Sequence, residues 1–278
     1  MLKIIAAVLL ILSSVPAKAQ LFAAKSHSVA MGHHHLNVED VEKNLAFFTA
    51  LGGEKIDFAH YQIVRFPNVL VFLRAGKPTA ESSGSVVHHF GLHVKDLSSV
   101  LARLRAANMS IVSKEFIGDK LEVDDQGIAY NPAMDARLAF ARAPNGTWIE
   151  LYEKKDLNRP VENHHIHFYE PEFEAMKTWY VTMLGAKPGQ RGGMEAADLG
   201  GVNLTFSPEE KQAPTKGRAL DHIGFEVDNL EEFCRELKSK GVKFDRPYEE
   251  LPELGVAIAF FTDPWGTNVE LTEGLDRL

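Results

Sequence analysis

Histidine is the residue type in this sequence with the most chemical potential, and its distribution is uneven. Ten of the 12 histidines fall in four β-rich stretches, at 33–35, 88–93, 164–167 and 222. Side chains alternate between the two faces of a strand, so His33 and His35 share one face, as do His165 and His167. Imidazoles gathered on one face of a strand favour metal binding or proton transfer.

Two glutamates complete these patterns. Glu150 and Glu270 lie inside apolar stretches, where an unpaired carboxylate would be costly. Matched positions define one set in each half of the chain, namely His33, His89 and Glu150, and then His165, His222 and Glu270. Two imidazoles and a carboxylate suit a divalent ion that keeps open positions, such as Fe²⁺, Mn²⁺, Ni²⁺ or Zn²⁺. The alternative is a buried His–Glu hydrogen-bond network without an ion.

Other polar side chains share the faces of these ligands and could transfer protons. We single out four as candidate catalytic residues: His35, His167, Tyr169 and Glu226. His93 and Tyr152 are two more groups of the same kind. General acid–base catalysis needs such a group within hydrogen-bonding distance of the substrate.

The elements that must position these residues occur in repeated blocks. A histidine-led strand is followed by an amphipathic helix that ends at Leu51-Gly52 in the first half and at Leu184-Gly185 in the second. The matched positions are offset by 132, 133 and 120 residues, which indicates an insertion within 115–136 of the first half. A repeat longer than 100 residues indicates paired domains and not a solenoid, whose period is roughly 20–50 residues.

Each half subdivides again into a strand, a helix and several strands. The sequence therefore predicts an α+β fold of four βαβββ modules, paired into two domains with mixed, largely antiparallel sheets. We expect the first domain at 27–155 and the second at 163–278, joined by a linker at 156–162 that contains Pro160.

The N-terminus has the layout of a secretory signal peptide. A short positive start precedes the apolar run 4–12, and Ala17-Lys18-Ala19 supplies small residues at a cleavage site before Gln20. Nine apolar residues are too few to span a bilayer, which needs about 20. We therefore expect residues 1–19 to be removed and the mature chain to be secreted or periplasmic, with no membrane association.

Charge and cysteine content exclude several classes of function. The net charge of -8 would become -10 after loss of Lys3 and Lys18, which argues against a general nucleic-acid or anionic-membrane binder. The single cysteine, Cys234, excludes an intramolecular disulfide framework and a thiolate-rich metal cluster.

The motifs as a set resemble the vicinal oxygen chelate superfamily, which includes glyoxalase, bleomycin-resistance and extradiol-dioxygenase proteins. The resemblance is carried by Asp221-His222-Ile223-Gly224-Phe225-Glu226-Val227 and by Asp263-Pro264-Trp265-Gly266-Thr267-Asn268-Val269-Glu270. It implies paired βαβββ modules that close around a cup. It also implies a divalent ion that binds two adjacent oxygens of a small-molecule substrate.

The resemblance leaves three functions open. The first is a glyoxalase-like lyase or isomerase, although the stretches 68–73 and 202–206 lack the further carboxylate ligand usual in glyoxalase I, and Asn203 is the only substitute in the second half. The second is an Fe²⁺ ring-cleavage dioxygenase, although Phe260 occupies the place of that family's tyrosine. The third is a binding protein of the bleomycin-resistance type, which would sequester a ligand without turnover. Monomer and homodimer both remain compatible with two fused halves.

Overall fold

The structure of the chain is a computed structural model that describes residue 21 and residues 29–278. The predicted signal peptide at 1–19 and the start of the predicted first domain lie outside the described residues. Within the described part of the chain, no helix is both long enough and apolar enough to cross a membrane.

Four βαβββ modules follow one another along the chain, which confirms the predicted α+β class. Module 1 comprises β1 (Val29–Val38), α1 (Val41–Leu51), β2 (Glu54–Phe58), β3 (Tyr61–Phe66) and β4 (Val69–Ala75). Module 2 comprises β5 (Val87–Val94), α2 (Leu97–Ala106), β6 (Ser110–Ile111), α3 (Ser113–Ile117), β7 (Ala129–Asn131), β8 (Ala136–Arg142) and β9 (Trp148–Glu153). Module 3 comprises β10 (Val161–Tyr169), α4 (Phe173–Leu184), β11 (Lys187–Arg191), β12 (Met194–Leu199) and β13 (Val202–Ser207). Module 4 comprises β14 (Leu220–Val227), α5 (Leu230–Ser239), β15 (Phe244–Leu251), β16 (Val256–Thr262) and β17 (Asn268–Glu273), followed by a short 3-10 turn, η2 (Leu275–Arg277).

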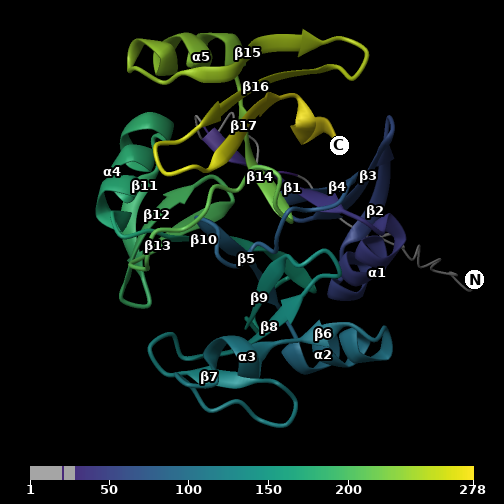
Figure 1. The fold of residues 1–278 in the computed structure, drawn as a ribbon. Coiled ribbons are helices and arrows are strands. Elements are labelled where there is room, and N and C mark those ends of the chain that lie inside the picture. Colours follow the sequence, from purple (N-terminus) through teal and green to yellow (C-terminus); the bar gives the residue numbers. More distant parts are fainter. Residues whose placement is uncertain (1–20, 22–28) are drawn as a thin grey trace, which may run out of the picture.

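The modules combine into two sheets, and each sheet draws on both halves of the sequence. The first sheet has the strand order β15-β16-β17-β14-β1-β4-β3-β2, so modules 4 and 1 are joined through β14 and β1. The second has the order β11-β12-β13-β10-β5-β9-β8-β6, so modules 3 and 2 are joined through β10 and β5. Figure 1 shows β14, β1, β10 and β5 at the centre of the molecule, with the helices towards its edges.

This pairing differs from the organisation expected from the sequence, in which each half, 27–155 or 163–278, closes its own cup. The physical reason lies in the connections. Only residues 154–160 separate β9 from β10, and so short a connection keeps β10 in the sheet of β5 and β9. The longer segments 76–86 and 208–219 change sheets and run beside each other, with Val86 N–H donating to Ala213 O at 2.9 Å and Ala219 N–H donating to Ala80 O at 2.9 Å.

Local sequence signals explain where the helices begin and end. Asp40 caps α1 because its Oδ1 accepts a hydrogen bond from the Lys43 backbone N–H at 2.9 Å. Gly52, which follows α1, adopts the left-handed conformation with φ 108°, and Gly185 does the same after α4 with φ 71°. These are the two Leu-Gly stops in the repeated blocks.

The two sheets share one apolar core, to which alternate side chains of the central strands contribute. Leu36 of β1, Phe90 of β5, Ile166 of β10 and Phe225 of β14 are all fully buried in this core. The residues between them, including His33 and His165, therefore face the other side of each sheet. Each sheet thus offers its polar face to a separate cup.

His34 is an exception within the core. Its ring stacks on Phe90 with centroids 4.0 Å apart, and neither ring nitrogen has a hydrogen-bond partner among the described residues. Burial lowers the pKa of His34 well below 6.5, so the ring is neutral. Ile166 occupies the equivalent position in β10.

We predict that His34→Ile stabilises the protein, because it removes two unpartnered buried polar atoms. The expected gain in the free energy of unfolding is about 1–3 kcal/mol, and Ile166→His should lose at least about 2 kcal/mol. Denaturation midpoints of the two variants and the wild type measure both effects. A His34→Ile protein less stable than the wild type would contradict this reading of the core.

Glu226 lies on the same face of β14 as His222 but lines a different cavity from the one that His222 lines, contrary to its prediction as a catalytic residue. Four residues of extended chain separate the two by about 13 Å. Its Oε2 accepts a hydrogen bond from Thr272 Oγ1 at 2.6 Å, and its Oε1 accepts from the backbone N–H of Gly274 at 2.5 Å and of Leu275 at 3.0 Å. Glu226 therefore anchors the C-terminal turn.

The anchor gives a pH-dependent stability that can be measured. Burial raises the pKa of Glu226 from 4.5 to about 7, so the folded protein binds this proton more tightly than the unfolded chain. Relative to Glu226→Gln, which cannot ionise, the wild type should lose stability as the pH rises from about 4.5 through about 7, by up to about 3 kcal/mol. Denaturation midpoints at pH 5, 6, 7 and 8 test this, and parallel profiles for the two proteins would refute it.

Candidate metal centres

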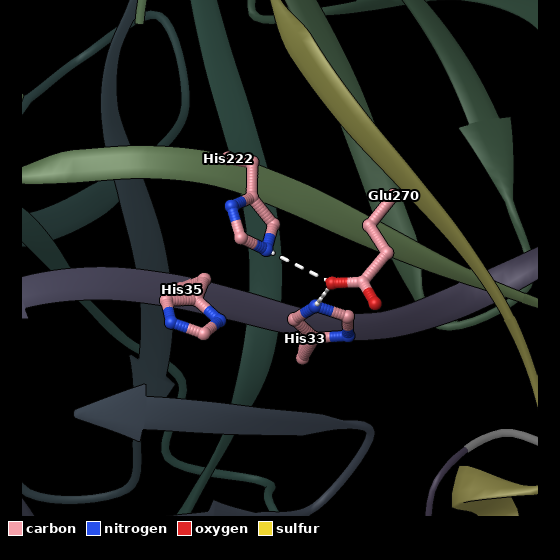
Figure 2. Close-up of side chains that lie close together, drawn as sticks. All are labelled: His33, His35, His222 and Glu270. Atoms are coloured by element: carbon pink, nitrogen blue, oxygen red, sulfur yellow. Dashed lines mark hydrogen bonds and ion pairs between the residues drawn. The ribbon is translucent and has the colours of Figure 1, made fainter. Parts of the chain in front are cut away.

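The first cluster of candidate ligands lies where β1, β14 and β17 run side by side. It consists of His33 and His35 from β1, His222 from β14 and Glu270 from β17 (Figure 2). One ligand atom from each residue lies within 4.8 Å of the others, and all four residues are buried. Strand register produces this, because His35 pairs with His222 across β1 and β14, and Gly224 lies opposite both His33 and Glu270.

A single carboxylate oxygen is the centre of this cluster. Oε2 of Glu270 lies 2.9 Å from Nε2 of His33 and 2.9 Å from Nε2 of His222. The other ring nitrogen of His222, Nδ1, lies 2.7 Å from Oδ1 of Asp221. When Nδ1 donates its hydrogen to Asp221, the lone pair of Nε2 faces the carboxylate of Glu270. A proton or a cation is then needed between these two acceptors.

The protonation equilibria reflect the same contacts. Burial would raise the pKa of Glu270, but the charges and hydrogen bonds of His33 and His222 hold it well below its ordinary value. Burial would lower the pKa of His222, but its hydrogen bonds to Asp221 and Glu270 raise it. The pocket therefore favours positive charge beside an ionised Glu270.

The donor set fits a divalent metal ion. The two imidazoles of His33 and His222 and the carboxylate of Glu270 are ligands that Zn²⁺, Ni²⁺, Fe²⁺ and Mn²⁺ accept, and the imidazole of His35 lies beside them. Nε2 of His35 is buried and has no hydrogen-bond partner among the described residues. The Asp221–His222 hydrogen bond is the outer-sphere contact that usually orients a metal-binding imidazole.

Glycine makes room for a histidine from the opposite half of the chain in each sheet. A Cβ atom on Gly224 would lie 2.0 Å from Cε1 of His33, and one on Gly91 would lie 2.0 Å from Cε1 of His165. Any larger residue would displace these rings. This explains the glycine in the His-x-Gly motif as a requirement of the partner module.

The first cup is the cavity above this cluster, with a volume of about 580 Å³. Its wall is mainly apolar and aromatic, formed by Phe58, Tyr61, Phe72, Leu251, Leu254, Val256, Ile258, Phe260 and Leu275. Charged side chains that also line it are Arg74, Lys216, Asp245 and Arg246. The cluster therefore faces a space large enough for a small organic molecule.

The second cluster repeats the arrangement in the other sheet. It consists of His89 from β5, Glu150 from β9, and His165 and His167 from β10, again with ligand atoms within 4.8 Å of one another. Oε2 of Glu150 lies 2.9 Å from Nε2 of His165 and 3.4 Å from Nε2 of His89. Burial would raise the pKa of Glu150, but His89 and Arg191 lower it to about 2.

The outer contacts of the second cluster differ from those of the first. Nδ1 of His89 lies 2.9 Å from Nδ1 of His88, and Nδ1 of His165 lies 3.0 Å from Nδ1 of His164. Neighbouring imidazoles thus take the position that Asp221 has in the first cluster.

The second cup is the cavity above this cluster, and at about 270 Å³ it is the smaller of the two. Residues 113–135, which include α3 and β7, overlap the stretch 115–136 where the sequence indicated an insertion. Phe116, Ile117, Lys120, Leu121 and Asn131 from this segment line the cavity. The insertion therefore narrows the second cup.

The structure brings all six sequence-predicted metal ligands into clusters, but in a different grouping. His33 lies with His222 and Glu270, and His165 lies with His89 and Glu150, so each cluster crosses the two halves. The expected sets within each half are wrong, because β1 pairs with β14 and β10 pairs with β5.

The candidate proton-transfer residues lie in different places in the structure. His35 and His167 lie within the two clusters, and Tyr169 lines the second cup with its ring 4.7 Å from that of His167. Tyr152 also lines the second cup. His93 stacks on His164 and lines a separate surface cavity.

Two residues that contact the clusters were given no role on the basis of the sequence. Asp221 directly precedes His222, and this adjacency was a usable signal for a residue that orients an imidazole. Arg191 is the last residue of β11, and its Nη2 lies 3.6 Å from Oε2 of Glu150. Its position depends on the β11–β12 hairpin, and no motif marks it.

Comparison with known proteins agrees with this architecture. Residues 163–271 match the family model of the Glyoxalase/Bleomycin resistance protein/Dioxygenase superfamily. No curated protein matches the sequence. Glyoxalase I from Zea mays superposes with a TM-score of 0.68 at 18% identity, covering 90% of this chain and 94% of that one. A candidate dioxygenase from Bacillus subtilis superposes with a TM-score of 0.59 at 14% identity, covering 88% of this chain and 85% of that one.

The sequence match covers residues 163–271, and the structural matches extend the shared fold over most of the chain. At these identities the structural matches establish the fold alone. Residues 163–271 therefore belong to the Glyoxalase/Bleomycin resistance protein/Dioxygenase superfamily, also called the vicinal oxygen chelate superfamily, and the chain as a whole has the fold of glyoxalase I.

Proposed function

We propose that this protein is an exported, divalent-metal-dependent enzyme of the glyoxalase-like lyase or isomerase type, which binds a small substrate through two adjacent oxygens. The observation that carries the proposal is the first cluster. Three imidazoles and a carboxylate offer ligand atoms within 4.8 Å of one another and face a cavity of about 580 Å³.

His33, His222 and Glu270 would hold the ion in the first cup. When bound, a divalent ion supplies Lewis-acid polarisation of the substrate oxygens. Asp221 fixes the tautomer of His222 by accepting a hydrogen bond from its Nδ1. The aromatic side chains of Phe72 and Phe260 restrict the entry of water, since both line the cup beside the imidazoles.

His35 is the group best placed to move a proton in this cup. Its Nε2 has no partner among the described residues, and burial lowers its pKa well below 6.5, so the ring is neutral. A neutral imidazole beside a polarised carbonyl can take a proton from the adjacent carbon and return it to the neighbouring one. In the second cup, His167 and Tyr169 occupy the corresponding place beside His89, Glu150 and His165.

An Fe²⁺ ring-cleavage dioxygenase is the second candidate. Two histidines and a carboxylate with open positions suit non-haem Fe²⁺, and the similarity to the Bacillus subtilis candidate dioxygenase agrees in fold. Against it, Phe260 brings an apolar ring to within 5.4 Å of the His222 ring, between centroids, where a hydroxyl would be needed. A sequestering protein would have no need for two complete ligand sets, and this favours the enzyme.

Export completes the proposal. The positive start, the apolar run 4–12 and the small residues before Gln20 support a secreted or periplasmic location. The partner is a small molecule, and the protein acts as a monomer or homodimer without nucleic acid.

The metal requirement is tested on protein purified without chelator. We expect a first-row metal ion to copurify, and its removal by a chelator to abolish turnover until the ion is restored. Glu270→Gln should lower turnover at least about 100-fold, because it removes the anionic ligand, and exposed Glu253→Gln should not. His35→Ala should keep the ion but lose turnover.

The bound ion and the substrates also separate the candidates. Isomerisation of 2-oxoaldehyde thiol adducts with zinc or nickel supports the lyase or isomerase. Bound iron together with oxygen uptake in the presence of catechols would contradict the lyase or isomerase and support the dioxygenase. A metal-free protein that turns over neither substrate but binds small aromatics would support the sequestering protein.

A further inference from the structure

The second cup contains a buried positive charge that the proposed metal chemistry does not use. Arg191, the last residue of β11, is 7% exposed and lines the cavity above the second cluster. Its Nη1 donates a hydrogen bond to Thr205 Oγ1 at 3.2 Å, and its guanidinium carbon lies 5.0 Å from the centroid of the Tyr152 ring.

These contacts leave part of the guanidinium unsatisfied. Its Nε and Nη2 have no hydrogen-bond partner among the described residues. Nη2 lies 3.6 Å from Oε2 of Glu150, which is an ion pair but too long for a hydrogen bond. Burial of a cation with unmade hydrogen bonds is costly, so the pocket is incomplete without an acceptor.

Among the residues that the structure describes, the first cup has no buried cation equivalent to Arg191, and Lys216, which lines it, is exposed. The two arginines that line it have half-exposed side chains, Arg74 at 50% and Arg246 at 45%. The first cup has two buried carboxylates, Glu270 and Asp221, whereas in the second cluster Arg191 offsets the single carboxylate of Glu150. A divalent cation alone is therefore favoured in the first cluster, and the second accepts a cation best together with an anion.

We propose that the second cup binds a small 2-oxo- or 2-hydroxycarboxylate, whose carboxylate Arg191 anchors through the free edge of its guanidinium. The inference rests on the proposed function in one respect, that an ion held by His89, Glu150 and His165 takes the adjacent oxygen. The volume of about 270 Å³ suits a small ligand of this kind. The larger, apolar first cup selects a different ligand, so the two cups divide the substrate range between them.

Oxalate is a suitable probe, because it presents two adjacent oxygens and a carboxylate. We would titrate it into the Zn²⁺-loaded protein by calorimetry and measure Zn²⁺ affinity by chelator competition. Arg191→Met, which keeps the packing on Tyr152, should weaken oxalate binding at one site by at least about tenfold and tighten Zn²⁺ at the second cluster by about tenfold. Arg191→Lys should show smaller changes, and Arg74→Met in the first cup should leave the second site unchanged.

The opposite directions of the two changes separate an anion anchor from a structural role. Damage to the fold would weaken oxalate and Zn²⁺ together, and that result would overturn the proposal, as would unchanged oxalate binding in Arg191→Met.

Failure of the metal function is distinguishable from failure of this inference. If the wild type binds no Zn²⁺, the proposed function fails, and the oxalate titration of chelator-treated protein decides the inference. There we expect one site with affinity on the order of millimolar that Arg191→Met abolishes. Its persistence in that variant would overturn the proposal.

Discussion

Antiparallel pairing of β1 with β14, and of β5 with β10, is the interaction on which both candidate centres depend. Each pairing sets a histidine from one half of the chain against a glycine from the other, His33 against Gly224 and His165 against Gly91. The rings approach so closely that a Cβ atom could not be added to either glycine. The strand register therefore requires a glycine opposite each histidine, and both together fix the position of the ligand. The same requirement applies in both sheets.

Charge distinguishes the two centres that this shared geometry creates. Asp221 adds a second buried negative charge behind His222, whereas Arg191 offsets the charge of Glu150. The cups differ in the same sense, one large and apolar, the other narrowed by the segment 113–135 and lined by a buried cation. A duplication of the modules, followed by divergence of the residues next to each cluster, accounts for two sites that share one architecture but differ in electrostatic environment.

Sequence patterns predicted the modules and the ligands because both depend on local signals. Gly52 and Gly185 ended the helices as expected, and the alternation of strand residues placed His33 and His35 on one face. The pairing of modules was not predicted. The strand patterns of β1 and β10 are so similar that they do not specify whether each strand pairs with a module of its own half or of the other half. Only the short connection at 154–160 distinguished the two arrangements, through its length and not its composition.

The contacts of two further residues could not be predicted from the sequence, for a related reason. Arg191 enters the second cup through the hairpin of β11 and β12, and Glu226 turns out to anchor the C-terminus because η2 returns to β14. Both positions depend on contacts between segments distant in the chain. A strand pattern can specify which face a side chain occupies, but not which neighbour it meets there.

Metal stoichiometry in two double variants tests the central claim, that each centre combines ligands from both halves of the chain. His33→Ala with Glu270→Ala removes two ligands of one cluster and should leave about one ion per chain. His33→Ala with Glu150→Ala removes one ligand from each cluster and should leave almost none. The reverse result, no ion in the first double variant and about one in the second, would show that each half closes its own centre and would contradict the account.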